Sequence, residues 1–219
     1  MVVPESIVML VTKFRKKFKS STVDTFVLNR LYIAFFIELV KAYGYEEAIR
    51  RLFEWGYVWG HACLLKLEKD IEKFPFEAKS LKIIGRVAWY IFSGTDPTEV
   101  VIEEREIDEK PWFILQVRDE NSPWDRDFSF GKRIAHLPAG AYEAASNVFS
   151  ILCGKRQWYC ISRNTKSLAA SDPYTEITTL YIPKDTPKEI VIELFPNLFE
   201  DISYEFSRDL YERVISPGE

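Results

Sequence analysis

Two histidines and a few nearby acids are the residues of this sequence that could perform acid–base chemistry. His136 has Asp125 and Asp127 close by in sequence, a combination compatible with general acid–base catalysis. His61 directly follows Gly60 on a predicted helix. Nothing in the sequence fixes a nucleophile or an oxyanion hole around either histidine. We therefore expect no catalytic residues and a protein that binds rather than catalyses.

Three cysteines could ligate a metal or form disulfides. Cys153 and Cys160 straddle a predicted helix-to-strand turn, whereas Cys63 falls on another helix. Metal sites need three or four convergent ligands, and a free cysteine is more often a small core residue. An odd number at irregular spacing gives no disulfide framework and favours a reducing compartment. No glycine-rich phosphate loop is present either. We expect no metal, no cofactor and a cytoplasmic location.

The composition is that of a globular protein with a thick core. Of 219 residues, 47% are hydrophobic and 28% are charged, which excludes a disordered chain. The 16 Phe, 11 Tyr and 6 Trp residues can fill a core, and they can also line an apolar pocket. A net charge of −4 gives no general electrostatic support for nucleic-acid binding. The charge-rich sequence contains only two glutamines, which favours a thermophilic source.

The first 20 residues combine an apolar stretch with a basic run. The apolar residues 7–11 are too few to span a bilayer, and no small-residue cleavage site follows them. The basic run extends from Lys13 to Lys19. Two interpretations stay open: a solvated end of the domain, or an amphipathic segment that contacts a membrane surface through Lys13 to Lys19.

The spacing of apolar residues divides the rest of the chain into a helical part and a strand-rich part. In the first helix the polar positions Arg30, Glu38 and Lys41 form only a thin strip, so we expect this helix to be central and mostly buried. The charged stretch 103–110 is expected at the tip of a hairpin. The predicted helices cover about 21–43, 46–70, 75–93 and 139–152, and the predicted strands cover about 100–102, 112–117, 157–161 and 177–182.

These elements predict an α+β fold with three N-terminal helices and an antiparallel four-stranded sheet. A helix lies between the two hairpin pairs, and a helical C-terminal tail follows, interrupted at Pro196. The tail has an apolar face, so it must dock on the domain or on a second chain. The predicted divisions are a basic amphipathic segment at 1–20, a ligand-binding domain at 21–183 and the tail at 184–219.

Gly56 and Gly60 lie on one face of the second predicted helix. Each glycine costs about 1 kcal/mol of helix stability relative to alanine. That cost is understandable if another backbone, or a ligand, must approach closely. The large side chains of Trp55, Tyr57 and Trp59 flank the bare strip. Close packing of helices is the first interpretation of this pair, and a wall of a ligand site is the second.

The run from Gly56 to Gly60, Gly-Tyr-Val-Trp-Gly, resembles the signature of the 4-vinyl-reductase domain family. It is also similar to the small subunits of the TRAPP vesicle-tethering complex, which share that fold. A second similar stretch is 84–97, with its helix, glycine and proline-bearing turn, and a third is Leu152-Cys153-Gly154. The resemblance covers about residues 22–183 and leaves the tail outside.

The resemblance implies a non-catalytic sensory or regulatory domain, commonly a homodimer, with a cavity for a hydrophobic small molecule or an acyl chain. The alternative is a TRAPP-like scaffold for protein interactions whose cavity is filled by side chains. An enzyme acting on a tetrapyrrole or hydrocarbon is suggested by the family name alone. On the leading interpretation, the ligand-binding residues are Phe35, Gly56, Trp59, Gly60, Cys63 and Trp89.

Two kinds of relative bind cofactors, and this sequence departs from both patterns. Zinc-binding relatives carry an additional cysteine near the start of the fourth helix, where this sequence has Ala139. Haem-based gas sensors of the same fold group carry Tyr-x-Ser-x-Arg, which Tyr159, Ser162 and Arg163 approach with the wrong spacing. The resemblance therefore implies neither zinc nor haem here.

Overall fold

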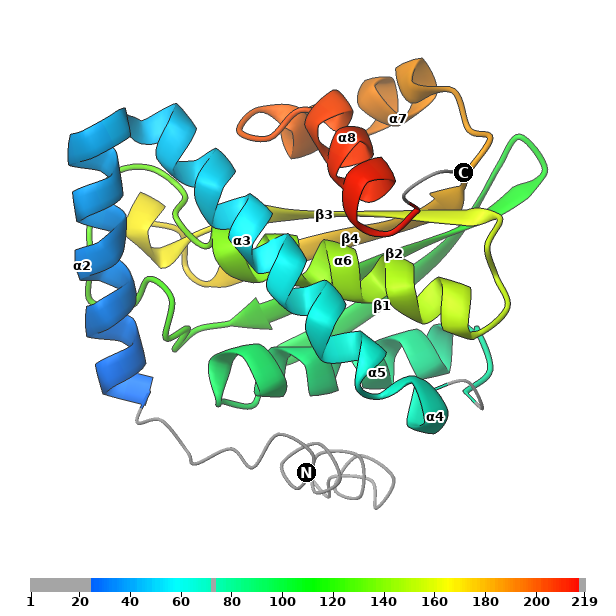
Figure 1. Ribbon diagram of the computed structural model, residues 1–219, viewed down its shortest axis with the longest axis horizontal. Helices are drawn as coiled ribbons and strands as arrows, with labels where there is room; N and C mark the ends of the chain where they lie inside the picture. Colours follow the sequence, from blue (N-terminus) through cyan, green and yellow to red (C-terminus); the bar gives the residue numbers. More distant parts are fainter. Residues whose placement is uncertain (1–24, 72–73, 217–219) are drawn as a thin grey trace.

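The computed structural model describes residues 25–71 and 74–216 (Figure 1). The predicted segment 1–20 and the predicted start of the first helix lie outside these residues. The helices are α2 (Thr25–Tyr43), α3 (Tyr45–Leu65), α4 (Glu68–Ile71), α5 (Ala78–Ser93), α6 (His136–Leu152), α7 (Lys188–Leu194) and α8 (Tyr204–Val214). The strands are β1 (Glu99–Ile107), β2 (Lys110–Asp119), β3 (Trp158–Lys166) and β4 (Thr175–Pro183), and the short 3₁₀ helices are η1 (Leu168–Ala170) and η2 (Pro196–Phe199).

The four strands form one antiparallel sheet in the order β1-β2-β4-β3. The two hairpins meet in the middle, where Leu115 of β2 lies opposite Thr179 of β4. Helix α6 connects the hairpins and crosses one face of the sheet (Figure 1). The predicted α+β fold, with a helix between the hairpin pairs and a helical C-terminal end, is confirmed.

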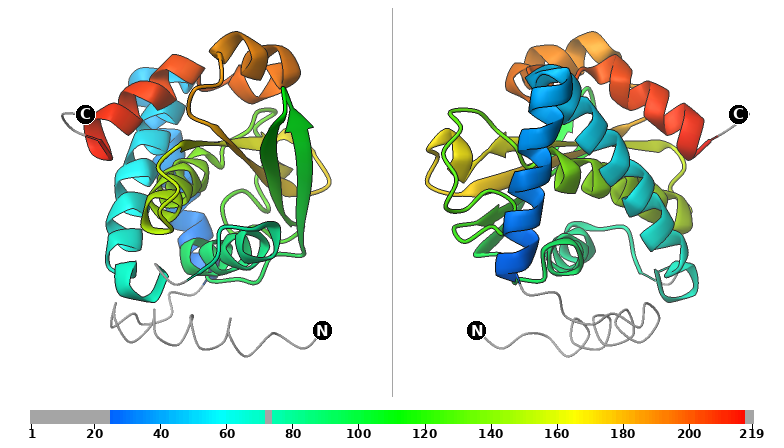
Figure 2. Two further views of the ribbon diagram at one scale, coloured as in Figure 1. Left: turned by 90° about the vertical axis from the view of Figure 1, so that its right-hand side faces the viewer. Right: turned by 60° about the vertical axis from the view of Figure 1, so that its left-hand side comes forward.

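The sheet has a hydrophobic core on each face, because alternate side chains of a strand point to opposite sides. On β2, Leu115 and Val117 belong to the core shared with α3, α5 and α6. Trp112 and Ile114 belong to the second core, which contains Val191, Leu198 and Tyr211 from α7, η2 and α8. The C-terminal tail therefore packs on its own domain, on the face of the sheet opposite α6 (Figure 2).

The second helix is shorter than predicted. It ends at Leu65, and the chain resumes as the one-turn helix α4, whereas the periodicity predicted a single helix to about residue 70. At the break, the Leu67 amide donates a 2.9 Å hydrogen bond to the Leu64 carbonyl, which lies three residues earlier in the chain. Leu67 and Ile71 are both buried, so the break redirects the chain to bring them into the core.

The first hairpin is longer than predicted, and its tip takes up only two residues of the charged stretch 103–110. Strand β1 continues to Ile107, and only Asp108 and Glu109 form the turn, with φ of 51° and 59°. Residues 103–106 are exposed on β1, an edge strand of the sheet. Charges are favourable on an edge strand because they discourage pairing with another chain. Hydropathy alone therefore assigned residues 103–106 to a loop, although they belong to β1.

The prediction of a central, mostly buried first helix is wrong. Helix α2 lies at one side of the molecule (Figure 2), and its outer face exposes Val27, Leu31 and Phe35 to 46%, 63% and 44%. Its inner face packs on the long connection between β2 and α6: the ring of Tyr32 meets that of Trp124 edge-on at 5.1 Å. The connection thus has a structural role, which is to hold α2.

Candidate functional site

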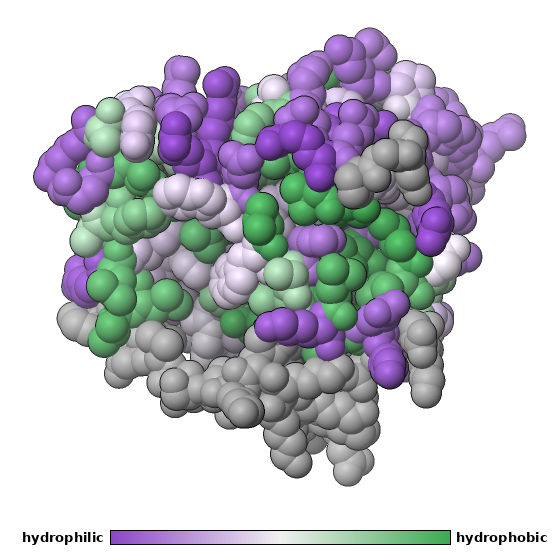
Figure 3. Space-filling model, viewed as in Figure 1, coloured by the Kyte–Doolittle hydropathy of each residue, from purple (hydrophilic) through white to green (hydrophobic). Residues whose placement is uncertain are grey.

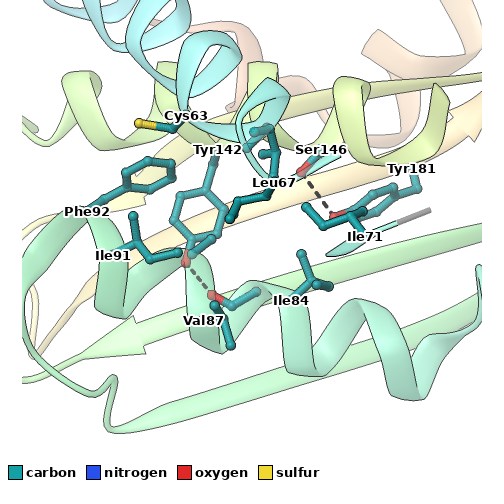
Figure 4. Close-up of a pocket in the computed structure, with 14 residues that line it drawn as sticks. Cys63, Leu67, Ile71, Ile84, Val87, Ile91, Phe92, Tyr142, Ser146 and Tyr181 are labelled. Atoms are coloured by element: carbon teal, nitrogen blue, oxygen red, sulfur yellow. Dashed lines mark hydrogen bonds between the residues drawn. The ribbon is translucent and has the colours of Figure 1, made fainter. Parts of the chain in front are cut away.

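An apolar pocket lies between α3, α4, α5 and α6 (Figure 4). It encloses about 500 Å³ not filled by atoms, including open solvent at its mouth. The part of this space that a water-sized sphere can enter is only about 30 Å³, well below the roughly 300–1,000 Å³ of small-molecule sites, so a ligand would have to displace lining side chains. The lining consists of Cys63, Leu64, Leu67, Ile71, Ile84, Gly85, Val87, Ala88, Ile91, Phe92, Tyr142, Ala145, Ser146 and Tyr181.

Helical spacing brings these residues to one place. Ile84, Ala88 and Ile91 repeat every three or four residues, so they share one face of α5. Cys63 and Leu67 continue the apolar face of α3 across the break into α4. Tyr142, Ala145 and Ser146 of α6 complete the lining between the two faces.

The hydroxyl groups in the lining form hydrogen bonds with one another or with the backbone. The Tyr142 hydroxyl donates to the Gly85 carbonyl, and the hydroxyls of Tyr181 and Ser146 are 3.0 Å apart (Figure 4). Burial raises the pKa of Tyr142 well above its usual value, so this hydroxyl stays protonated. The surface offered to a ligand is consequently that of a hydrocarbon.

Burial also determines the chemistry of Cys63. It raises the pKa of this thiol to about 11. Since the thiolate is the nucleophile, Cys63 is a weak one at neutral pH.

The glycine pair lies at the crossing of α3 and α6. A Cβ atom on Gly56 would be 1.9 Å from the Leu137 carbonyl oxygen, and one on Gly60 would be 2.2 Å from that of Ala141. Gly140 of α6 makes the reciprocal contact, since its Cβ would be 2.0 Å from the Phe53 carbonyl oxygen. The glycine pair therefore lies where the backbones of two helices pack closely, as the first interpretation expects. Gly140 is the partner on α6 that sequence reasoning missed.

The other predicted ligand residues are dispersed. Cys63 lines the pocket, and the ring of Trp59 lies 4.9 Å from that of Phe92, at an angle of 58°; Phe92 also lines the pocket. Trp89 is buried, and its indole N–H donates to Asp119 at 3.0 Å. Phe35 does not line the pocket: it is exposed on α2, where its ring stacks on Trp55 at 5.3 Å.

Sequence reasoning missed Tyr142, Ser146 and Tyr181 as lining residues. Tyr142 and Ser146 are four apart on the fourth predicted helix, so a helical projection would have placed them on one face. Tyr181 gave no such signal, because only the sheet places β4 beneath that helix.

His136 and Asp125 have different partners. His136 is buried at the start of α6, and its Nε2 lies 3.2 Å from the Arg133 carbonyl oxygen. Because a carbonyl only accepts, this nitrogen carries the proton. Asp125 is also buried, and it accepts hydrogen bonds of 2.5 Å from Ser167 and Thr175. Both groups fix the connection that holds α2, and neither lines the pocket.

Burial of His136 predicts a loss of stability in acid. Burial lowers its pKa to about 4, whereas histidine in an unfolded chain has a pKa of about 6.5. Below pH 6.5 the unfolded state binds a proton that the folded state excludes. The stabilisation is therefore complete above about pH 6.5 and falls by about 3 kcal/mol as the pH approaches 4.

The measurement is urea unfolding of the wild type and of His136→Gln across this range. Asp119, Asp125 and Glu143 have pKa values raised by burial, so their protonation stabilises the folded state and opposes the histidine effect. The difference between the two proteins isolates His136, and a difference that does not change with pH would contradict the prediction.

Two further features concern metals and membranes. Among residues 25–71 and 74–216, no three His, Cys, Asp or Glu side chains are grouped so that they could hold a metal ion. Within the same residues, no helix has both the length and the apolar character needed to cross a bilayer.

No protein-family model matches the chain, and no curated protein does. Solved structures are similar to it. One is subunit 3 of the trafficking protein particle complex (TRAPP) from Naegleria fowleri, covalently bound to palmitic acid. It is 16% identical over 72% of this chain and 95% of that chain, with a TM-score of 0.54. The chain shares the fold of this TRAPP subunit.

A second similar structure is the phenol-responsive sensory domain of the transcription activator PoxR with phenol. It is 16% identical over 83% of this chain and 85% of that chain, with a TM-score of 0.47. At such identities the TRAPP likeness concerns the fold alone. Membership of the 4-vinyl-reductase family is an expectation from sequence motifs, with no matching family model behind it.

Proposed function

We propose that this chain is a non-catalytic sensory or regulatory domain that binds a hydrophobic small molecule or an acyl chain. The proposed site is the pocket between α3, α4, α5 and α6. The observation that carries the proposal is its lining: aliphatic and aromatic side chains from four helices surround a space whose hydroxyls are already hydrogen-bonded. Each methylene buried there would contribute about 0.8 kcal/mol.

The palmitate of the TRAPP subunit makes an acyl chain the first ligand to test. In that protein the fatty acid is covalently bound. Here the pKa of Cys63 is raised, which favours a protonated thiol and non-covalent binding. We therefore expect a bound fatty acid to leave with organic solvent alone, without a reagent that cleaves thioesters.

The test is native mass spectrometry of the purified protein, followed by thermal unfolding with added palmitate. Ligand at a hundredfold excess over Kd stabilises a protein by about 2.7 kcal/mol. For a chain of this length, that raises Tm by about 5–10 °C. The variant Ala88→Phe places a ring in the pocket and should lose the shift, whereas Leu194→Phe, on the exposed surface of α7, should keep it. A folded wild type with neither bound lipid nor a shift would refute the proposal.

A protein-interaction scaffold is the second candidate. The rings of Phe92 and Tyr142 project into the pocket and narrow it, as a cavity closed by its own side chains requires. In that case Ala88→Phe would overpack the filled space and destabilise the protein, and palmitate would have no effect. A wild-type protein that copurifies with lipid would exclude this alternative.

The remaining expectations from the sequence belong to the same proposal. We propose a cytoplasmic homodimer from a thermophilic source, in which Lys13 to Lys19 contact an anionic membrane surface. Sedimentation with anionic and neutral vesicles tests the membrane contact: no difference between the two vesicle types would contradict it.

A further inference from the structure

An apolar stripe runs along the outside of α2. Figure 3 shows apolar side chains gathered over this helix, at the left of the view. Val27, Leu31 and Phe35 repeat every four residues, so they lie in one row, and Leu31 is 63% exposed. Ala34 is exposed beside that row. We call these residues the α2 stripe.

The contacts of the inner face hold α2 in this orientation. The buried Asn29 side chain donates to the Arg126 carbonyl at 3.1 Å, and the buried Tyr32 hydroxyl donates to the Ile134 carbonyl. Turning the helix to bury the α2 stripe would break both hydrogen bonds and leave their polar groups unpaired. Contiguous exposed apolar surfaces mark interaction sites, so we expect a cover from outside residues 25–71 and 74–216.

The sequence directly before α2 carries a matching stripe. Residues 1–24 lie outside the described part of the chain and end where α2 begins. Apolar residues recur among them at intervals of three and four, which is the spacing of one helix face. They are Ile7, Leu10, Phe14 and Phe18, with Val11 beside Leu10.

We propose that residues 7–18 form a helix that packs antiparallel on the α2 stripe of the same chain. Residues 19–24, Lys-Ser-Ser-Thr-Val-Asp, make the connection, and connections of about 2–8 residues between packed helices are usual. A helix over residues 7–18 is about 18 Å long, which is enough to cover a stripe of about 12 Å.

The two stripes match residue by residue. In an antiparallel pair, each step back along one helix accompanies a step forward along the other. Once Phe18 lies opposite Val27, the remaining apolar side chains therefore fall opposite one another as well. The resulting pairs are Phe18 with Val27, Phe14 with Leu31, Val11 with Ala34 and Leu10 with Phe35.

The packing is compatible with the membrane contact proposed above and separate from the ligand pocket. Lys13 and Lys16 project from the side of the helix opposite Phe18, so they stay accessible to an anionic surface. None of the α2 residues lines the pocket. Leu31→Glu should therefore keep any palmitate shift, and a failure of ligand binding can be told apart from a failure of this packing.

Disulfide trapping in the full chain tests the register. Phe14→Cys combined with Leu31→Cys should form a disulfide within one molecule under mild oxidation, because opposed Cβ atoms can reach the separation of about 4 Å that the bond needs. The control pair, Lys16→Cys with Leu31→Cys, places the first thiol on the far side of the helix and should yield at least ~10-fold less. Cys63 and Cys160 are buried, and peptide mass spectrometry identifies which thiols have joined.

Two results of the trapping would count against the proposal. Equal yields from the two cysteine pairs would overturn the register. A disulfide that forms only between molecules would show that a second copy covers the α2 stripe, and would overturn the packing within one chain.

Amide hydrogen exchange tests the cover without added cysteines. We expect residues 7–18 to exchange at least ~10-fold more slowly in the full chain than in the isolated peptide. Leu31→Glu places a charge under the segment and should abolish this protection. Leu194→Glu, at an exposed apolar position of α7, should keep it. Circular dichroism verifies that both variants are folded.

The same measurement can overturn the proposal in three ways. Exchange in the wild type could be as fast as in the peptide, or Leu31→Glu could leave the protection unchanged. Protection that appears only with anionic vesicles would assign the segment to the membrane in place of the α2 stripe.

Discussion

Gly60→Ala is expected to destabilise the protein by about 3 kcal/mol or more. The added Cβ would stand 2.2 Å from the Ala141 carbonyl oxygen and 2.7 Å from its Cα. Both atoms belong to the backbone of α6, so no side-chain rotation can relieve the overlap. The helices α3 and α6 must move apart, and the buried side chains around their crossing lose contact.

The measurement is chemical unfolding of the variant and of a matched glycine replacement. Gly85→Ala also places a methyl group inside a helix, but there the Cβ would meet the Cδ2 atom of Leu115 at 2.7 Å. A leucine tip can move, and alanine adds about 1 kcal/mol of helix propensity. We therefore expect a much smaller loss for Gly85→Ala. Equal losses for the two variants would contradict the backbone contact as the cause.

Arg163→Met is expected to cost about 3–5 kcal/mol, because it leaves a buried carboxylate without its counter-charge. Arg163 Nη1 donates to Glu143 Oε2 at 2.6 Å, and both side chains are almost completely buried. Burial raises the pKa of Glu143, while Arg163 opposes that rise. Without Arg163, Glu143 should take up a proton, so the variant should recover stability as the pH falls.

The same arginine attaches the C-terminal helices. It donates to the carbonyl of Ile202 at 3.0 Å, to that of Ser203 at 3.2 Å and to the Ser207 hydroxyl at 2.7 Å. Amide hydrogen exchange in α8 should therefore accelerate more than exchange in the sheet.

Two comparison variants make the Arg163 prediction specific. Arg105→Met breaks an exposed pair with Glu103, and such pairs contribute at most about 1 kcal/mol. Arg163→Met combined with Glu143→Met removes both buried charges and should be less destabilising than Arg163→Met alone. A single variant that loses less than the exposed control would contradict the prediction.

Much of the fold could be predicted because its helices and strands follow from the spacing of apolar residues along the chain. The three-to-four spacing of Ile84, Ala88 and Ile91 placed one apolar face on α5, and the structure uses that face for the pocket. The glycine pair indicated a close approach, since glycine is unfavourable inside a helix without one. The site as a whole could not be predicted, because its lining comes from elements that only the sheet and the α3–α6 crossing bring together. Tyr181 is the clearest case.

The sequence alone determined the order of helices and strands, the breaks at Gly44, Gly94 and Pro196, and the close approach of a backbone or a ligand at Gly56 and Gly60. These features depend on neighbours within a turn or a strand. Only the tertiary structure decided that α2 buries one face and exposes the other, and that residues 103–106 form part of an edge strand. An apolar stripe specifies that something must cover it, but whether the cover is the same core or another chain depends on contacts far apart in sequence.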